Sequence, residues 1–365
     1  MKVAIVHYWL INMRGGEKVL EALCELFPEA DIYTHVYDPA LISDKINKHC
    51  VTTTFIQQLP FATKAYQKYL PLMPLALEQL DLTDYDLVIS SESGPAKGVI
   101  TSPDAIHVCY CHTPMRYLWD MYPAYRKELG WLTRGLFSLI AHYLRVWDCT
   151  SAARVDCFLA NSDYVRKRIK KFYRRDAQVI HPPVDVQAFA ASVQPREDFY
   201  LVVSELVSYK RVDLAVEACN QLNRRLVVIG SGEQYKKIAA LAGDNVTLLG
   251  RQPFDVIKDH YASCRALIFP GQEDFGMVPV EAMASGAPVI AFGRGGATET
   301  VKDGITGVFF NQATVTSLIE VIRRFERKMS EFSESEIMAH AEQFDIATFN
   351  TKFLAVVEKC SASSV

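Results

Sequence analysis

Short runs of apolar, often β-branched residues alternate along the first half of the chain with segments of helical periodicity. The first such pair is KVAIVHY at residues 2–8, followed by GEKVLEALCELF at residues 16–27. Continuous apolar runs are typical of strands that are covered on both faces, as in parallel sheets. We therefore predict β-α units around a buried parallel sheet, with further strands in YDLVISS, IHVCYCH, DCFLANS and AQVIHPP.

The alternation stops at residues 182–198, PPVDVQAFAASVQPRED, a segment with three prolines and little periodicity. We predict an interdomain linker there, because proline interrupts both helices and strands. The alternation then resumes, with strands expected in FYLVVS, RLVVIG, NVTLLG, ALIFPG and APVIAFG and helices at residues 210–221, from Glu233, at residues 254–263 and after Pro279. From Thr314 onward the pattern is helical.

The predicted fold class is α/β, with two Rossmann-like, doubly wound parallel-sheet domains facing each other across a cleft. We assign residues 1–184 to the N-terminal domain and residues 185–345 to the C-terminal domain. A C-terminal helix at residues 346–365 is free to pack back on the N-terminal domain. Open α/β sheets bind ligands at the carboxyl ends of their strands, so the active site is expected between the two halves.

Length and composition narrow the class of protein. A chain of 365 residues suits two hydrophobic cores, and 39 basic against 42 acidic residues exclude a disordered or nucleic-acid-coating chain. Nine scattered cysteines without a CxxC pair favour a reducing compartment, so we expect a cytoplasmic protein. The sequence contains no apolar run of about 18 residues, and its apolar start is too short for a signal peptide.

Two carboxylates lie eight positions apart in FPGQEDFGMVPVEAMASGAPVIA, at Glu273 and Glu281. Glu273 follows the expected strand ALIFP, and Glu281 is placed in the first turn of a helix that begins near Pro279. Both can then face one pocket, together with free backbone N–H groups of Gly276, Met277 and Val278. Carboxylates hold sugar hydroxyls, and a helix N-terminus attracts phosphate. The alternative is an N-cap acid followed by a solvated helix acid.

Two glycine-containing turns also follow expected strands. Gly15 and Gly16 open the helix after the first strand, and Gly230 and Gly232 follow RLVVIG in the second half. Such turns let a backbone approach a ligand closely, although an ordinary tight strand-to-helix turn explains them equally well. Neither half carries GxGxxG, which argues against a dinucleotide-dependent dehydrogenase.

Basic and imidazole side chains complete the set of strand-end candidates. Lys210 and Arg211 stand where the loop after FYLVVS enters a helix, so a cation there can neutralise a leaving diphosphate or simply be solvated. His112 ends a strand in CYCHTP and is either structural or a contact to reacting groups. The motif at residues 84–86, Asp-Tyr-Asp, begins a strand instead of ending one, so we interpret it as a strand cap and predict no metal.

A helical segment at residues 125–147, YRKELGWLTRGLFSLIAHYLRVW, combines aromatic and apolar residues with four basic ones. With the basic run at residues 166–175 it suits peripheral contact with the anionic inner face of a membrane. A helix packed on the core with one solvated face fits the same pattern.

Taken together, these residues resemble the large family of retaining glycosyltransferases with the GT-B fold, family 4, over nearly the whole chain. The resemblance rests on the E-x7-E pair in EDFGMVPVEAMASGAPVIA, on the glycines near the N-terminus, on the lysine in SYKR, on His112 and on GGATETV. The stretches HTPMRYLWDMYPAY and HPPVDVQAF look most like bacterial enzymes that build surface polysaccharides, often mannosyltransferases.

The resemblance implies a function and a set of roles. A hexose, by resemblance mannose from GDP-mannose, would move to a hydroxyl of a glycan or lipid-linked acceptor with retained anomeric configuration, without metal, cofactor or nucleic acid. By resemblance, Glu273 would hold the sugar hydroxyls and Glu281 the ribose of the donor. Gly16 and Lys210 would bind the diphosphate, and His112 would lie near the donor sugar at the reacting face. Arg251 and Gln252 would lie near the base.

One position departs from the family pattern. An arginine is often found shortly before the lysine, whereas this chain has Glu205 in Ser-Glu-Leu. A carboxylate facing a diphosphate repels it, so either Glu205 turns away or Arg211 supplies the missing charge. Two other classes stay open, a GT-B-fold epimerase or hydrolase of nucleotide sugars and a catalytically silent binding subunit.

Overall fold

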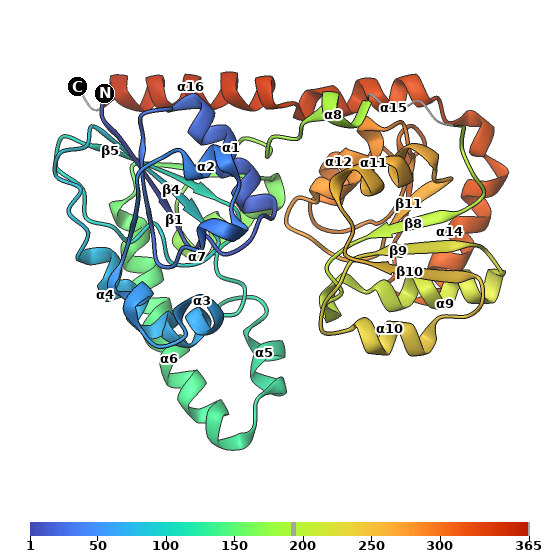
Figure 1. Cartoon of the computed structure of the whole chain (residues 1–365), viewed down its shortest axis with the longest axis horizontal. Helices are drawn as coiled ribbons and strands as arrows, with labels where there is room; N and C mark the ends of the chain where they lie inside the picture. The colour runs from blue at the N-terminus through green and yellow to red at the C-terminus, as the bar shows by residue number, and fades with distance from the viewer. Residues whose placement is uncertain (191–194, 364–365) are drawn as a thin grey trace. The chain divides into compact units, whose positions relative to one another are not determined.

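A computed structural model describes residues 1–190 and 195–363 of the chain (Figure 1). The chain divides into two compact units, one formed by Met1–His181 with Phe349–Val365 and the other by Pro182–Thr348. Residues 191–194 of the expected linker lie outside the described residues, while its earlier part contains a short helix, α8 (Val186–Ala190). The C-terminal helix α16 (Ile346–Ser363) contributes most of its length to the first unit.

The sheet of unit 1 is wholly parallel, with the order β3-β2-β1-β4-β5-β6-β7. Its strands are β1 (Val3–His7), β2 (Asp31–Thr34), β3 (Val51–Thr53), β4 (Leu87–Glu92), β5 (Ile106–Cys111), β6 (Cys157–Ala160) and β7 (Gln178–Val179). Every residue of β1, β4 and β5 is buried, as their apolar patterns predict. Strands β2 and β3 were not predicted, because they are short and only partly buried.

Helices cover both faces of this sheet (Figure 1). The helices of unit 1 are α1 (Gly15–Leu26), α2 (Asp44–Asn47), α3 (Ala62–Ala65), α4 (Met73–Glu78), α5 (Tyr122–Glu128), α6 (Trp131–Ser151) and α7 (Asp163–Tyr173), together with most of α16. Short 3₁₀ helices lie at Pro39–Leu41, Phe55–Gln58, Tyr66–Leu72 and Ala152–Arg154. Helices α5 and α6 extend away from the sheet (Figure 1).

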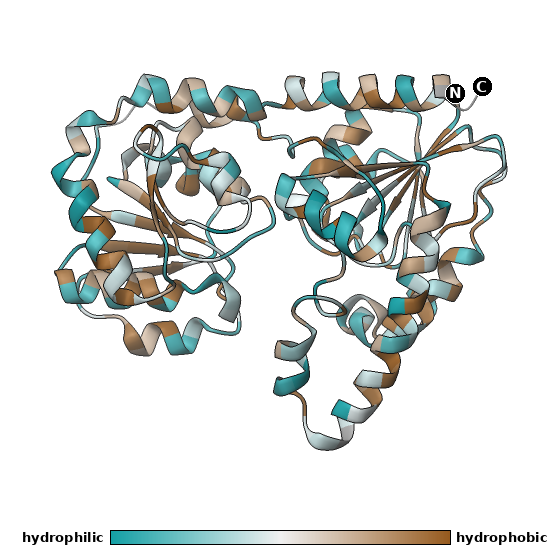
Figure 2. Cartoon of the chain, turned by 180° about the vertical axis from the view of Figure 1, so that it is seen from behind, coloured by the Kyte–Doolittle hydropathy of each residue, from teal (hydrophilic) through white to brown (hydrophobic). Residues whose placement is uncertain are grey.

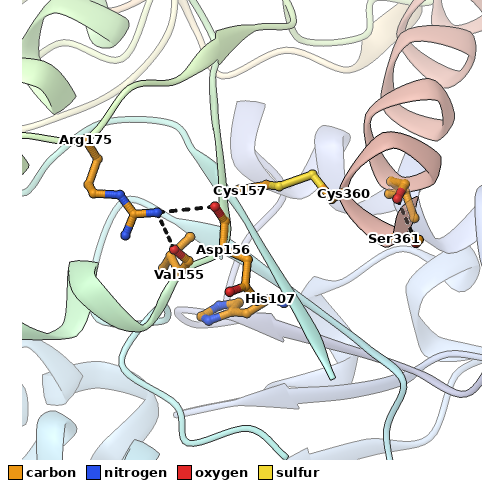
Figure 3. The surroundings of a disulfide bond; sticks show 8 residues. His107, Val155, Asp156, Cys157, Arg175, Cys360 and Ser361 are labelled. Carbon is orange, nitrogen blue, oxygen red and sulfur yellow. Dashed lines mark hydrogen bonds between the residues drawn. A yellow bond between two sulfur atoms is a disulfide. The ribbon is translucent and has the colours of Figure 1, made fainter. Parts of the chain in front are cut away.

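Helix α16 joins the core of unit 1 through its aromatic face. Phe349 and Phe353 are almost fully buried, and the ring of Phe349 lies 5.7 Å from that of Tyr110 in β5. A disulfide joins Cys360 of α16 to Cys157 of β6 across 203 residues of sequence (Figure 3). The expectation of a reducing compartment did not anticipate this bond, because sequence spacing carries no signal for two cysteines that only the fold brings together.

Unit 2 contains a second parallel sheet, with the order β10-β9-β8-β11-β12-β13. Its strands are β8 (Tyr200–Val203), β9 (Leu226–Ile229), β10 (Val246–Gly250), β11 (Ala266–Phe269), β12 (Val289–Phe292) and β13 (Gly307–Phe310). The strands of both sheets are mainly hydrophobic (Figure 2). The α/β prediction with two doubly wound sheets is therefore confirmed, although β13 was not predicted.

The helices of unit 2 follow the expected rhythm with shifted starts. They are α8, α9 (Val212–Leu222), α10 (Tyr235–Leu241), α11 (Phe254–Ser263), α12 (Met277–Ala284), α13 (Ala297–Thr300), α14 (Val315–Arg327) and α15 (Glu334–Ala341), with 3₁₀ helices at Ser208–Lys210, Met329–Glu331 and Glu342–Phe344. Helix α12 begins at Met277, two residues before Pro279, and α9 begins two residues after Lys210.

Each sheet has one point where the strand order reverses direction. In unit 1 this is the pair β1 and β4, and in unit 2 the pair β8 and β11. Loops leave such neighbouring strands toward opposite faces of the sheet, which opens a crevice at their carboxyl ends. The candidate residues of each unit can be located against these two points.

Candidate functional site

An ion pair lies at the reversal point of unit 2. Lys210 comes from the loop after β8 and Glu273 from the loop after β11, and the Lys210 ammonium contacts Oε1 of Glu273. The two side chains retain 15% and 20% exposure, so a ligand can reach both. Two residues 63 positions apart in the sequence therefore meet because their strands are neighbours.

The electrostatic surroundings of Lys210 are acidic. Burial lowers the pKa of Lys210, whereas the negative charge of Glu273 raises it, as do Tyr209 and Glu205. The net effect is a raised pKa. Lys210 is therefore a cation at neutral pH. Glu205 is exposed, yet its charge acts on the same ammonium group, so it has not turned away completely.

Arg211 is paired with an acidic residue of its own helix. Its Nε lies 3.1 Å from Oδ1 of Asp213, within the first turn of α9. Arg211 also has a left-handed backbone, with φ of 51°, at the N-cap of that helix. Its guanidinium is paired within its own helix, and a role of Arg211 in balancing Glu205 stays a prediction.

Close approach of two loops explains Gly232. It follows β9 with φ of 155°, and an added Cβ would lie 2.5 Å from the carbonyl oxygen of Leu206 in the loop after β8. A side chain there would push that loop, and Lys210 with it, away from the sheet. The glycine therefore shapes the lysine loop through backbone packing.

Helix α12 begins at Met277, four residues after Glu273. Gly276 is its N-cap residue, and the N–H groups of Met277 and Val278 have no partner within the helix because they open it. These groups carry the positive end of the helix dipole. This end of the helix therefore favours an anion, as the charge of Lys210 does.

Glu281 lies deeper in α12 than predicted. It is the fifth helical residue instead of a first-turn residue, because the helix begins at Met277. Its Oε2 accepts a hydrogen bond of 2.9 Å from the hydroxyl of Tyr261 in α11. Burial raises the pKa of Tyr261 well above its usual value, and Glu281 and Glu273 both add to the shift. The two carboxylates of the E-x7-E pair thus act on one buried phenol.

Arg251 and Gln252 lie farther along the sheet. Both follow β10, the edge strand that β9 separates from β8. Arg251 is exposed, while the side-chain amide of Gln252 donates to the carbonyl of Leu249 at 2.6 Å. The structure therefore does not group these residues with the ion pair of Lys210 and Glu273.

Gly15 and Gly16 open α1 directly after the loop that leaves β1. A Cβ at Gly16 would lie 2.2 Å from the hydroxyl oxygen of Tyr8, so a side chain here would require Tyr8 to move. The next residue, Glu17, is buried, and its Oε2 accepts a hydrogen bond of 2.8 Å from the backbone N–H of Arg14. The glycine pair thus places a buried carboxylate at the reversal point of unit 1.

His112 follows β5 immediately and belongs to a buried polar chain. Its Nε2 lies 2.9 Å from Oγ of Ser91 in β4, and the same oxygen lies 3.0 Å from Nδ1 of His7 in β1. Burial, with the nearby His7 adding to it, lowers the pKa of His112 to about 3, so its ring is neutral. Sequence reasoning missed His7, Ser91 and Glu17, although the polar residues that end KVAIVH and LVISS were a usable signal.

Other polar groups of unit 1 have structural partners. Asp86 precedes β4 and accepts a hydrogen bond of 2.6 Å from the backbone N–H of Lys2, as expected for a strand cap. Within residues 1–190 and 195–363, no three His, Cys, Asp or Glu side chains gather as a metal site would require. In the same described part of the chain, no helix is long and apolar enough to cross a bilayer.

Comparison with known families places both units in one class. Residues 184–339 match the model described as "Glycosyl transferases group 1", and residues 13–188 match "Glycosyltransferase Family 4". The two matches together run from residue 13 to residue 339, the match over residues 13–188 including β2 to β7 and the match over residues 184–339 including β8 to β13.

Curated relatives are similar over part of their length. An uncharacterized glycosyltransferase of Methanocaldococcus jannaschii is 30% identical over 190 residues, which are 51% of this chain and 53% of that protein. The human alpha-1,3/1,6-mannosyltransferase ALG2 is 26% identical, with 60% and 59% covered. A GDP-mannose-dependent phosphatidylinositol monomannoside mannosyltransferase of Mycolicibacterium smegmatis is 29% identical, with 44% and 50% covered. The chain thus spans about half the length of these relatives.

Solved structures share the whole fold at low identity. Anabaena HepE in complex with UDP and glucose has a TM-score of 0.71 at 18% identity, with 98% of this chain and 99% of that chain covered. The sucrose-phosphate synthase of Thermosynechococcus elongatus has a TM-score of 0.73 at 16% identity, with both chains covered completely. These similarities show that the chain has the GT-B fold, which consists of two parallel-sheet domains.

Proposed function

Since the chain belongs to the family 4 glycosyltransferases of the GT-B fold, we propose that it transfers a hexose from a nucleotide diphosphate sugar to a hydroxyl group. The observation that carries the proposal is the reachable pair of Lys210 and Glu273, of which Glu273 lies four residues before the first residue of α12. A cation and free N–H groups suit a diphosphate, and a carboxylate suits sugar hydroxyls. A nucleotide diphosphate sugar contains both a diphosphate and a sugar, so its binding requires both kinds of group.

We propose mannose from GDP-mannose as the donor. Two of the relatives are named mannosyltransferases, and one of them is named as GDP-mannose-dependent. The acceptor is a hydroxyl of a glycan or lipid-linked glycan used in polysaccharide biosynthesis. These specifics rest on the resemblance and on the names of relatives that this chain matches over about half their length.

The chemistry asks the protein mainly for positioning and charge stabilisation. Lys210 and the N–H groups of Met277 and Val278 stabilise the diphosphate as its charge develops, while Glu273 holds the sugar and Glu281 the ribose. The departing phosphate takes the proton of the acceptor hydroxyl, so the anomeric configuration is retained without an enzymic nucleophile. No metal takes part in this proposal, and the roles of Gly16 and His112 remain predictions.

A product assay tests this function. The full chain is incubated with GDP-mannose, UDP-glucose and related donors, with and without lipid-linked acceptors. The products are identified by mass spectrometry, and their anomeric configuration is determined. Glycosylated acceptor with a retained anomer supports the proposal, and the same yield in EDTA supports the metal-free mechanism. Consumption of the donor without an acceptor would instead indicate the hydrolase or epimerase. Nucleotide binding without turnover of any donor would indicate the silent binding subunit, which Glu205 makes a specific alternative.

We further propose that α5 and α6 contact an anionic membrane surface. The large exposed apolar side chains of α6 are Trp131, Leu136, Leu139, Tyr143 and Val146. The last four follow a spacing of three, four and three residues, so they share one face of the helix. Arg126 and Lys127 of α5 add basic charge, and α6 carries no exposed carboxylate among its described side chains.

Part of the basic run at residues 166–175 has partners within the chain. Arg166 and Lys167 pair with Asp163, and Lys170 pairs with Asp176. Arg168 is buried. These cations are engaged within the chain, so the membrane proposal rests on α5 and α6.

Vesicle flotation tests the membrane contact. Vesicles with anionic lipid are expected to carry the chain to the top of the gradient at low salt, and Leu139→Glu is expected to abolish this. Leu354→Glu in α16, where Leu354 is 39% exposed, is the matched control and should float like the unaltered chain. Absence of flotation at low salt would contradict the proposal.

A further inference from the structure

A chain of four buried polar side chains connects α1 to the end of β5. Oε1 of Glu17 lies 3.5 Å from Nε2 of His7, and Nδ1 of His7 lies 3.0 Å from Oγ of Ser91. The same Oγ lies 2.9 Å from Nε2 of His112. Glu17, His7 and Ser91 are 1% exposed or less, so water does not compete for these contacts.

Glu17 determines which groups donate and which accept along this series of polar side chains. Its Oε2 already accepts the N–H of Arg14 at 2.8 Å, and Oε1 faces His7. At 3.5 Å the two groups do not form a hydrogen bond, and Nε2 of His7 has no hydrogen-bond partner among the described residues. The negative charge of the carboxylate nevertheless favours a proton on Nε2 over a lone pair. In a neutral imidazole with its proton on Nε2, Nδ1 carries a lone pair.

Ser91 passes this direction to His112. The hydroxyl has one proton, which it donates to the lone pair on Nδ1 of His7, and its oxygen then accepts the N–H of His112 Nε2. A neutral His112 with its proton on Nε2 has its lone pair on Nδ1. Among the described residues, nothing hydrogen-bonds to that second ring nitrogen, and the side chain keeps 9% exposure.

We propose that Glu17, His7 and Ser91 are positioning residues that fix the tautomer of His112, so that its Nδ1 accepts a hydrogen bond from a substrate hydroxyl. This inference rests on the proposed function, since a sugar hydroxyl is the donor that Nδ1 would meet. A histidine of the opposite tautomer would present an N–H and favour an acceptor such as a phosphate oxygen. The relay thus selects a hydroxyl at this position.

The substitution Glu17→Gln is expected to reverse the relay. The amide oxygen must take the position of Oε2, because the N–H of Arg14 requires an acceptor there. The amide NH₂ then faces Nε2 of His7 and favours a lone pair there, so His7 is expected to donate from Nδ1 and Ser91 to donate to Nε2 of His112. His112 would consequently carry its proton on Nδ1.

Long-range ¹H–¹⁵N correlation spectra of the full chain with ¹⁵N-labelled histidine measure this directly, with His112 identified by its absence in His112→Gln. We expect a protonated Nε2 in the unaltered chain and a protonated Nδ1 in Glu17→Gln. Glu21→Gln, which alters another buried carboxylate of α1, should leave His112 unchanged. An unchanged tautomer in folded Glu17→Gln would overturn the proposal.

Ser91→Ala provides a second test that does not depend on the folding of Glu17→Gln. Without the hydroxyl, Nε2 of His112 loses its partner, and both tautomers should be populated. A single, unaltered tautomer in Ser91→Ala would overturn the relay. Both spectra are recorded without a sugar donor, so their outcome is independent of the transferase assay. As a further readout, Glu17→Gln should raise KM for the donor about tenfold, equivalent to one mismatched hydrogen bond.

Discussion

Lys97 and Lys210 each meet a glutamate at the carboxyl end of a strand, but the two pairs differ in exposure. Lys97 lies 2.7 Å from Glu92, the last residue of β4, and also contacts Asp148 of α6, with all three side chains fully buried. Lys210 and Glu273 in unit 2 remain 15% and 20% exposed. A ligand can therefore reach the pair of Lys210 and Glu273 but not the pair of Lys97 and Glu92.

The surroundings explain the difference. Asp148 also accepts hydrogen bonds from Trp119 and Tyr173, at 2.8 and 3.0 Å, so every charge near Lys97 is used to join α6 and α7 to the sheet. In unit 2, Glu273 instead precedes by four residues the start of α12, whose first N–H groups have no partner within the helix. A strand-end ion pair thus indicates a binding site only when it is reachable and when donors beside it are unused.

The largest expected effect is on catalysis. Lys210→Ala should lower kcat/KM about a thousandfold, because it removes the cation proposed to stabilise the leaving diphosphate. Lys328→Ala removes the lysine of an exposed pair with Glu331 and should retain full activity. Wild-type turnover in folded Lys210→Ala would remove Lys210 from the proposed site.

Lys97→Met should act on stability instead. It leaves Glu92 and Asp148 buried without a cation, which costs about 4 kcal/mol of unfolding free energy. All four tryptophans, at positions 9, 119, 131 and 147, belong to unit 1, so tryptophan fluorescence in urea reports on this unit alone. Lys210→Ala should not move that transition, and a shift as large as that of Lys97→Met would break the comparison.

The disulfide is a second stabilising contact of unit 1. Cys360→Ser should lower the unfolding free energy of that unit by about 3 kcal/mol, because the bond closes a long loop in the unfolded chain. The urea transition of tryptophan fluorescence measures the change. Cys50→Ser alters an exposed free thiol of the same unit and serves as the control. Equal transitions in the two variants would show that the bond does not form in solution.

The smallest expected effect concerns Tyr261. Tyr261→Phe removes the hydrogen bond to Glu281 and should raise KM for the donor about fivefold with little change in kcat, as expected for the loss of about 1 kcal/mol. Tyr200→Phe removes a similar bond, of 3.0 Å to Glu326, elsewhere in unit 2 and should leave KM unchanged. Equal KM values for the two variants would separate Tyr261 from donor binding.

Strand ends were the most informative signal in the sequence. The apolar runs that become β1, β4, β5, β8 and β11 were all predicted, so Glu273, Lys210 and His112 could be placed at carboxyl ends before the structure was known. The helix starts were less accurate, since Pro279 suggested the first turn of α12 while the helix begins at Met277. A proline fixes its own φ angle, but it does not mark the residue at which a helix begins.

Contacts between distant segments could not be predicted. Nothing in spacing joins Tyr261 to Glu281, His7 to Ser91 or Cys157 to Cys360, because each pair depends on how the elements pack. The same limit applied to Arg211, whose engagement by Asp213 became visible only with the left-handed turn at the start of α9. Sequence motifs identified charged candidates, whereas the neutral residues that hold them came from the fold.

Binding of nucleoside diphosphates tests the central claim most directly. GDP and UDP are titrated calorimetrically into the unaltered chain, Lys210→Ala and Lys97→Arg, the last of which keeps a cation beside Glu92. The account predicts binding of one of the two nucleotides, an affinity at least tenfold weaker in Lys210→Ala, and nearly unchanged affinity in Lys97→Arg. Equal affinities of the unaltered chain and folded Lys210→Ala would contradict it.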